Sequence, residues 1–190
     1  GMTPLVDADN DEELVRLNQK QKLDPPQWKN ARFDKYTFAQ GMRYLKKHQP
    51  KFLFLSLNDA DEWGHRNRYD MYTQTLKQYD VWIRELVAQL DAMGDYGNNT
   101  TLIITTDHGR GNGAEWSDHS IFTPGSQNIW LYGSSPITRE NGLLRSFDRG
   151  YTHLDIRPTI EWTMGLEPLP CEKNSCGRVI EELVGPRWNN

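Results

Sequence analysis

The chain has 190 residues, a length that fits one domain with a single sizeable core. Its 22 Lys and Arg residues stand against 26 Asp and Glu residues, and no basic run alternates with aromatic residues. This balance argues against nucleic acid as a partner, because a surface that follows phosphates needs clustered positive charge. No apolar stretch approaches the roughly 20 residues that span a bilayer, so no membrane span is expected.

The first 30 residues are polar and acid-rich and end near two consecutive prolines, Pro25 and Pro26, which favour extended chain. We expect residues 1–30 to form a polar arm or connector ahead of one folded domain over residues 31–190. Gly1 ahead of Met2 resembles the scar of a removed tag, so further sequence upstream is expected.

The apolar pattern along the rest of the chain alternates between two periods. Apolar residues that recur every three or four positions predict amphipathic helices over 34–48, 72–90, 153–164 and 178–184. Continuous apolar runs predict buried strands over 52–57, 101–106 and 128–132. A long helix between the first two strands implies a parallel crossover. The predicted fold class is α/β, in three layers, with a mainly parallel sheet covered by helices on both faces.

Polar clusters follow the first two predicted strands, at the edge where ligands bind in open parallel sheets. In the first cluster, the spacing of Asp61 and His65 places both side chains on one side of a helical turn, with Asp59 as an alternative to Asp61. In the second, adjacent Asp107 and His108 converge only if the strand breaks there. The glycines at 109 and 111 permit such a break.

Each motif also has a purely structural interpretation. An Asp-His-Gly at a strand end is often a turn with a capping carboxylate, and Asp61 with His65 could be a surface helix pair. Their joint placement, together with His119 in a third polar loop, favours a metal site. Mixed carboxylate and imidazole ligands suit zinc, manganese or iron.

Several neighbouring residues have two open interpretations. Arg110 is either a clamp for a phosphate oxygen or a solvated loop charge. His153 is interpreted as structural, although it is the main rival of His119 as a ligand. His48 suits the negative end of a helix dipole. The remaining candidates shape a substrate pocket or belong to the core: Glu62, Trp63, Glu115 and Trp116.

Two cysteines, Cys171 and Cys176, lie close together without a second pair or nearby histidines, which makes a zinc site poor. A small disulfide loop and a pair of reduced thiols both remain open. A bridge would indicate an oxidising compartment.

The combined motifs resemble the alkaline phosphatase superfamily, which includes phosphodiesterases, phosphoglycerate mutases and sulfatases. They comprise Asp-x-x-Gly-His at 61–65, Thr-Asp-His-Gly at 106–109, the later His119, and a late helix from Asp155 that closes at Met164-Gly165. The resemblance covers residues 35 to 185.

The resemblance implies a set of metal ligands and an activity. It implies that Asp61, His65 and His119 hold one metal, while Asp107 and His108 contribute to a second. The implied activity is metal-dependent hydrolysis of small phosphate mono- or diesters with two ions, zinc or manganese foremost. The resemblance and the cysteine pair together suggest a periplasmic or secreted protein.

The chain departs from this family pattern in its first 50 residues. The family draws a further metal-binding Asp and a Ser, Thr or formylglycine nucleophile from upstream of the Asp-x-x-x-His loop, and no credible match for either occurs here. The catalytic nucleophile is therefore unknown, and we expect an N-terminally truncated piece rather than a degenerate relative. The alternatives are a sulfatase-like hydrolase of sulfate esters and a non-catalytic metal- or ligand-binding relative.

Overall fold

The computed structural model describes residues 11–28, 31–138, 142, 150–167, 169–172 and 176–185. The chain divides into two compact units. The first comprises residues 1–89 with 116–118, and the second comprises residues 90–115 with 119–190.

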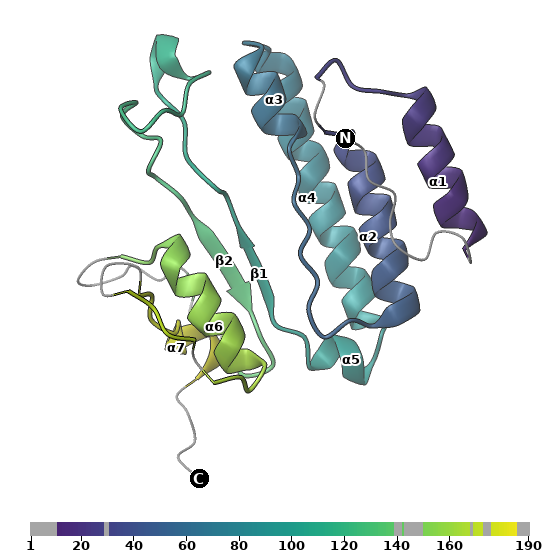
Figure 1. Cartoon of the computed structure of the whole chain (residues 1–190), viewed down its shortest axis with the longest axis vertical. Helices are drawn as coiled ribbons and strands as arrows, with labels where there is room; N and C mark the ends of the chain where they lie inside the picture. Colours follow the sequence, from purple (N-terminus) through teal and green to yellow (C-terminus); the bar gives the residue numbers. More distant parts are fainter. Residues whose placement is uncertain are drawn as a thin grey trace. The chain divides into compact units, whose positions relative to one another are not determined.

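The first unit is helical (Figure 1). Its helices are α1 (Glu12–Leu23), α2 (Asp34–His48), α3 (Asp59–His65) and most of α4 (Tyr69–Asp91). The predicted helices over 34–48 and 72–90 are confirmed by α2 and α4. Helix α1 lies inside the segment that the sequence suggested as an arm.

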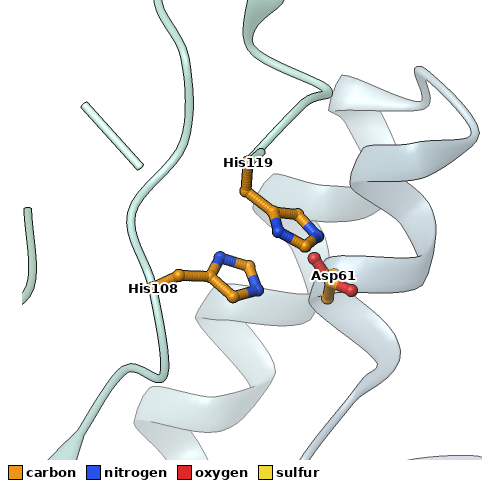
Figure 2. A group of neighbouring side chains, drawn as sticks. All are labelled: Asp61, His108 and His119. Carbon is orange, nitrogen blue, oxygen red and sulfur yellow. The ribbon is translucent and has the colours of Figure 1, made fainter. Parts of the chain in front are cut away.

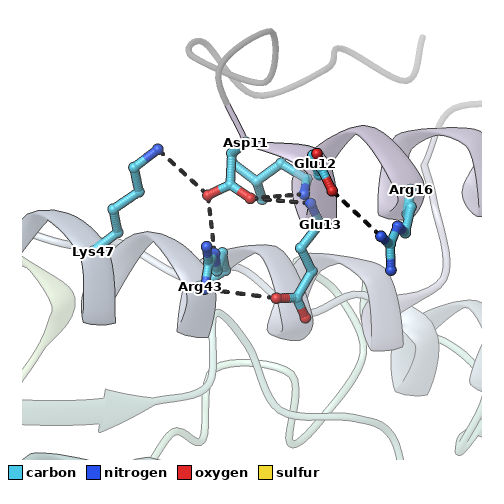
Figure 3. A network of polar contacts seen from close by, with 7 residues as sticks. Asp11, Glu12, Glu13, Arg16, Arg43 and Lys47 are labelled. Atoms are coloured by element: carbon cyan, nitrogen blue, oxygen red, sulfur yellow. Dashed lines mark hydrogen bonds and ion pairs between the residues drawn. The ribbon is translucent and has the colours of Figure 1, made fainter.

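Helix α1 begins at a buried carboxylate that also attaches it to α2 (Figure 3). Asp11 accepts hydrogen bonds from the backbone N–H groups of Glu13 at 3.1 Å and Leu14 at 3.3 Å, as an N-cap does. Its Oδ2 also contacts Arg43 Nε at 2.9 Å and Lys47 Nζ at 3.4 Å on α2. The hydrogen bond from Arg43 lowers the pKa of Asp11 to about 2, so the carboxylate is charged at neutral pH.

Large rings fill the interior of the first unit. Trp28 meets Trp63 of α3 edge-on, with ring centroids 5.3 Å apart. Phe38 of α2 stacks on Trp82 of α4 at 5.0 Å. Such aromatic pairs add to the stabilisation that burial of their area provides, so the first attaches α3 to the segment ahead of α2 and the second attaches α2 to α4.

The predicted strand over 52–57 is not among the strands of the described chain, although its side chains keep a strand-like alternation. Leu53, Leu55 and Leu57 are half-buried, whereas Phe52 and Phe54 are 54% and 76% exposed. Leu55 lies against Gly41 of α2, where an added Cβ would come within 2.3 Å of Leu55 Cδ2. One face of the segment is thus covered by α2, and the other carries two exposed phenyl rings.

The second unit contains a two-stranded sheet with short helices (Figure 1). Strand β1 (Leu102–Thr105) pairs with β2 (Leu131–Ser134), with Leu102 opposite Ser134 and Thr105 opposite Leu131. The other elements are α5 (Asp95–Asn98), the 3-10 turns η2 (Gly113–Glu115) and η3 (His153–Asp155), α6 (Ile156–Thr163) and α7 (Glu181–Val184).

The sequence predictions for this unit are confirmed in part. The strand over 101–106 is confirmed by β1, and the helix over 153–164 by η3 and α6. Strand β2 starts three residues later than the predicted strand over 128–132, and α7 is shorter than the predicted helix over 178–184. Because β1 and β2 run antiparallel, the mainly parallel sheet and the three layers stay predictions.

An apolar cluster from the C-terminal part of the chain forms the core of the second unit. Ile180, Leu183 and Val184 are buried and pack with Ile103 of β1 and Leu131 of β2. Cys171 and Cys176 form a disulfide, which decides between the two alternatives left open by the sequence. Within the described residues, no helix has both the length and the apolar character to cross a membrane.

Candidate metal centre

The first pair of predicted ligands lies on α3. His65 Nε2 and Asp61 Oδ2 are 3.3 Å apart, one helical turn from each other. The side chains are 45% and 28% exposed respectively, so both remain accessible to an ion. The structure therefore confirms that this spacing brings the two side chains to one face of a helix.

Asp34, a residue that the sequence did not single out, positions the start of α3. Its carboxylate accepts hydrogen bonds from the backbone N–H groups of Asn58 at 2.9 Å and Asp59 at 2.7 Å, and from the hydroxyl of Tyr79. Burial raises the pKa of Asp34 and also that of Tyr79. The only sequence signal was an acidic residue at a predicted helix start, which gives no hint of a contact 25 residues away.

Asp59, the alternative to Asp61, takes part in this buried network instead. Its Oδ2 accepts the backbone N–H of Asp34 at 3.0 Å. Burial, and then the charge of Asp34, raise the pKa of Asp59 to about 7. Its other oxygen, Oδ1, is buried without a hydrogen-bond partner. The more exposed Asp61 is the better candidate to bind a cation.

The second pair of predicted ligands follows β1 directly. Asp107 Oδ1 accepts the backbone N–H of His108 at 3.0 Å, and Asp107 Oδ2 lies 3.5 Å from His108 Nε2. The Asp107 side chain is 85% exposed and that of His108 is 23% exposed. The strand ends before these residues, which is the break that the sequence required.

Two glycines in this loop are required, because a side chain at either position would clash with the neighbouring backbone. Gly109 N donates to Ser126 O at 2.7 Å, and a Cβ on Gly109 would lie 2.1 Å from the carbonyl oxygen of Gly125. A Cβ on Gly111 would lie 2.3 Å from Glu115 O. Only glycine lets the loop after β1 approach the neighbouring backbone this closely.

The rings of His108 and His119 stack on each other within the second unit (Figure 2). Their centroids are 3.7 Å apart and their planes are inclined by 13°. His108 Nδ1 lies 2.9 Å from Gly109 O. Because a carbonyl can only accept, Nδ1 carries the hydrogen, and the lone pair of a neutral ring is then on Nε2. This arrangement is typical of metal-ligating histidines. Figure 2 also draws Asp61, which belongs to the first unit.

Successive tight turns order the chain just after His119. Thr123 N donates to Ser120 O at 2.9 Å, and Ser126 N donates to Thr123 O at 3.1 Å. The Ser126 hydroxyl also donates to Ser120 O at 2.8 Å, and both Thr123 and Ser126 are buried. His119 is thereby carried by a folded loop rather than by an open one.

The rival histidine, His153, has a different role in the structure. Its Nε2 lies 2.7 Å from the backbone oxygen of Thr106, at the residue that precedes Asp107. Because a carbonyl only accepts, this nitrogen carries the hydrogen, and the contact anchors the ring to the backbone beside Asp107. The ranking of His119 above His153 as a metal ligand stays a prediction.

The other singled-out residues have varied surroundings. Glu62 pairs with Arg66 at 2.6 Å, and Trp63 is buried in the core.

Trp116 contacts the rings of Tyr69 and Tyr72 edge-on at 5.3 and 5.7 Å. Arg110 lies in the loop after β1, and Glu115 ends η2. His48 ends α2 as predicted, beside the ring of Tyr44 at 4.5 Å.

Sequence comparison identifies the family. The profile of the metalloenzyme superfamily matches residues 26–123, a segment that contains all five predicted metal ligands. The chain belongs to the metalloenzyme superfamily. This superfamily is alkaline phosphatase-like, so the resemblance carried by the motifs at 61–65 and 106–109 is confirmed.

Curated relatives with matching sequences are named phosphopentomutases. The protein of Desulfitobacterium hafniense (strain DSM 10664 / DCB-2) is 28% identical over 141 residues, which are 73% of this chain and 32% of that protein. The protein of Clostridium kluyveri (strain NBRC 12016) is 33% identical over 144 residues, 74% of this chain and 32% of the relative. That of Acetivibrio thermocellus is 35% identical over 127 residues, 66% and 29% respectively.

The metalloenzyme chain thus spans about a third of the length of these curated relatives. No solved structure matches it significantly. The donor types present fit a divalent metal, because carboxylates and imidazoles are the ligands that zinc and manganese accept. Family membership and donor set together support the use of a divalent metal.

Proposed function

We propose that this chain carries metal-binding residues of an enzyme that transfers a phosphoryl group on a small phosphorylated sugar. Membership of the metalloenzyme superfamily supports metal-dependent phosphoryl chemistry. The names of the relatives favour a mutase acting on a pentose phosphate over the hydrolase that the motifs first suggested.

The stacked pair of His108 and His119 is the observation that carries this proposal. The two rings lie with their centroids 3.7 Å apart, and each offers a donor nitrogen within 4.8 Å of one on the other ring. Neighbouring imidazoles of this kind are typical ligands of a divalent metal.

The ligand sets of the proposal are those that the family resemblance implies. Asp61, His65 and His119 would hold one ion, and Asp107 and His108 would contribute to the other. When bound, such ions neutralise phosphate charge and hold the attacking and leaving oxygens of an in-line transfer. The residues of this chain keep the donors in place: Asp34 fixes the start of α3, and Gly109 lets the loop after β1 pack tightly.

A hydrolase of phosphate esters is the second candidate function, since the same ions could equally direct a water molecule at phosphorus. A sulfatase ranks lower, because three histidines exceed what a single-metal, oxygen-rich site needs. For the location of the protein we keep the proposal of an oxidising compartment, which the Cys171–Cys176 disulfide supports.

Titration with manganese(II), with the free ion measured by electron paramagnetic resonance, tests the metal-binding part of this proposal. The chain should bind about one ion tightly and a second ion more weakly, because one ligand set has three members and the other only two. His119→Ala should abolish tight binding, whereas His48→Ala should leave it unchanged. Equal binding by wild type and His119→Ala would contradict the ligand assignment.

Phosphoryl transfer is tested on a protein that spans the full length of the relatives. A protein that contains this sequence and has the length of the relatives should interconvert ribose 1-phosphate and ribose 5-phosphate in a manganese-dependent manner. Release of inorganic phosphate without isomerisation would replace the mutase with the hydrolase.

A further inference from the structure

We propose that His153 is a positioning residue that holds the loop bearing Asp107 and His108 in its metal-binding conformation. It does so through the hydrogen bond from its Nε2 to Thr106 O, at 2.7 Å. The inference rests on the proposed function, since it assigns a role in the binding of the same metal.

The hydrogen bond from His153 lies just beyond the end of the β1–β2 sheet. The β1–β2 ladder ends at Thr105, opposite Leu131, and the backbone is held again where Gly109 N donates to Ser126 O. The carbonyl of Thr106 lies between these two points and accepts from His153. Because a peptide unit is planar, fixing this carbonyl also fixes the backbone nitrogen of Asp107. The direction of the Asp107 side chain depends on that plane.

The ring of His153 is itself held by a rigid base. Thr152 and Asp155 form a capping box around η3, and Asp155 is fully buried. Asp155 Oδ1 accepts the backbone N–H of Arg178 at 2.8 Å. The Thr159 hydroxyl donates to Asp155 O at 2.6 Å and accepts from Ile180 N at 3.0 Å. The start of η3 is thus bound to the C-terminal segment, and His153 transmits this rigidity to the metal-binding loop.

The hydrogen bond to Thr106 O requires a donor atom at a defined distance from the backbone of residue 153. A carbonyl oxygen only accepts, so His153 must carry its hydrogen on Nε2. The side-chain amide of glutamine places a donor at about the same distance from the backbone, whereas that of asparagine is one carbon shorter. His153→Gln should therefore preserve the hydrogen bond, and His153→Asn should lose it while staying polar.

The test is a manganese(II) titration of the 190-residue chain and these two variants, followed at the second, weaker ion, because Asp107 and His108 belong to the two-member ligand set. His153→Asn should weaken binding of this ion about 10- to 100-fold, as expected for loss of a contact behind a metal ligand, and should leave the tight ion unchanged. His153→Gln should stay within about threefold of wild type. Thermal melting in EDTA controls for folding and should give closely similar midpoints for both variants. Unchanged binding by His153→Asn, or equal losses in both variants, would overturn the inference.

Nuclear magnetic resonance of ¹⁵N-labelled histidines gives a second readout that needs no metal. Wild-type His153 should appear as the Nε2–H tautomer, and the amide signal of Asp107 should shift in His153→Asn but not in His153→Gln. An Nδ1–H tautomer at His153 would refute the positioning role. If wild type bound no manganese while the tautomer and shifts were as expected, the proposed metal site would be wrong. The hydrogen bond from His153 would then exist without a role in metal binding.

Discussion

Asp34 and Asp59 each accept the backbone N–H of the other. Asp59 N donates to Asp34 Oδ2 at 2.7 Å, and Asp34 N donates to Asp59 Oδ2 at 3.0 Å. Since α2 begins at Asp34 and α3 at Asp59, each carboxylate satisfies an N–H group at the start of the other helix, which its own helix leaves unpaired. The helix that carries Asp61 is therefore held by a residue 25 positions earlier.

Replacing Asp34 with Asn should destabilise the first unit. The carboxylate serves three donors, from Asn58, Asp59 and Tyr79, and an amide offers only one oxygen to them. An unpaired buried group costs about 1 to 3 kcal/mol, and urea unfolding followed by tryptophan fluorescence should show a loss of that size. Asp80→Asn is the control, because its pair with Arg84 is exposed and worth no more than about 1 kcal/mol. Similar losses in both variants would show that the reciprocal contact contributes little.

Replacing Asp11 with Asn should weaken the attachment of α1 in a pH-dependent way. Asn is as good an N-cap as Asp, so the change removes mainly the charge that faces Arg43 and Lys47. The folded-state pKa, about 2, lies below the ordinary value of 3.8. The stabilisation is therefore complete above about pH 4 and is lost as the pH falls towards 2.

Urea midpoints of wild type and Asp11→Asn should accordingly differ at pH 7 and converge near pH 2. Glu12→Gln is the matched control, because Glu12 pairs with Arg16 in an exposed position one residue away. A difference that persists unchanged at pH 2 would mean that the charge of Asp11 is not the cause.

Replacing Gly109 with Ala should disrupt the loop after β1. The added Cβ would lie 2.1 Å from Gly125 O and 2.4 Å from Asn128 O, distances that force the backbone to move. Overpacking of this kind costs about 1 to 3 kcal/mol, and the movement should also weaken binding of the second, weaker manganese ion, to which His108 contributes. Calorimetry and metal titration on the same samples would measure both effects.

Gly113→Ala provides the comparison for Gly109→Ala. A Cβ on Gly113 meets nothing within 4 Å, but its φ of +58° strains any other residue. This variant should lose about 1 to 2 kcal/mol and keep its metal affinity. If both variants lost metal equally, close approach at Gly109 would not be the reason.

Reducing the Cys171–Cys176 disulfide should have a modest effect. The bridge joins residues only five positions apart, and closing so short a loop accounts for about 2 kcal/mol of chain entropy. Thiol titration without reductant should find no free cysteine, and dithiothreitol should lower the melting temperature slightly. Two reactive thiols in the untreated protein would contradict the bridge.

The sequence predicted best the helices whose own residues show a clear apolar periodicity. Helix α2 has the predicted bounds, and α4 extends the predicted helix by three residues at its start and one at its end. Helix α1 was missed because two of its three buried residues are polar, Asn18 and Gln21, so it lacks an apolar stripe. The sequence indicated α1 only through a local feature, the N-cap Asp11 ahead of a run of residues that favour helices.

Strand pairing and long-range contacts could not be predicted in the same way. The pattern at 128–132 indicated a strand but contained nothing that fixed its direction, and β2 runs antiparallel to β1. At the site, the spacing of Asp61 and His65 and the strand break after β1 follow from local geometry, so they were accessible to sequence reasoning. The contacts made by Asp34 and His153 join residues 25 and 47 positions apart, and no local pattern specifies them.

We expect the exposed segment at 52–57 to promote self-association of the chain. Its six residues, Phe-Leu-Phe-Leu-Ser-Leu, contain no charge and no proline, and two phenyl rings face outward. Short uncharged stretches with strong β-propensity stack readily into intermolecular sheets when they are exposed. Light scattering of concentrated samples should rise with time and fall on Phe54→Lys, which places a charge in the middle of the stretch.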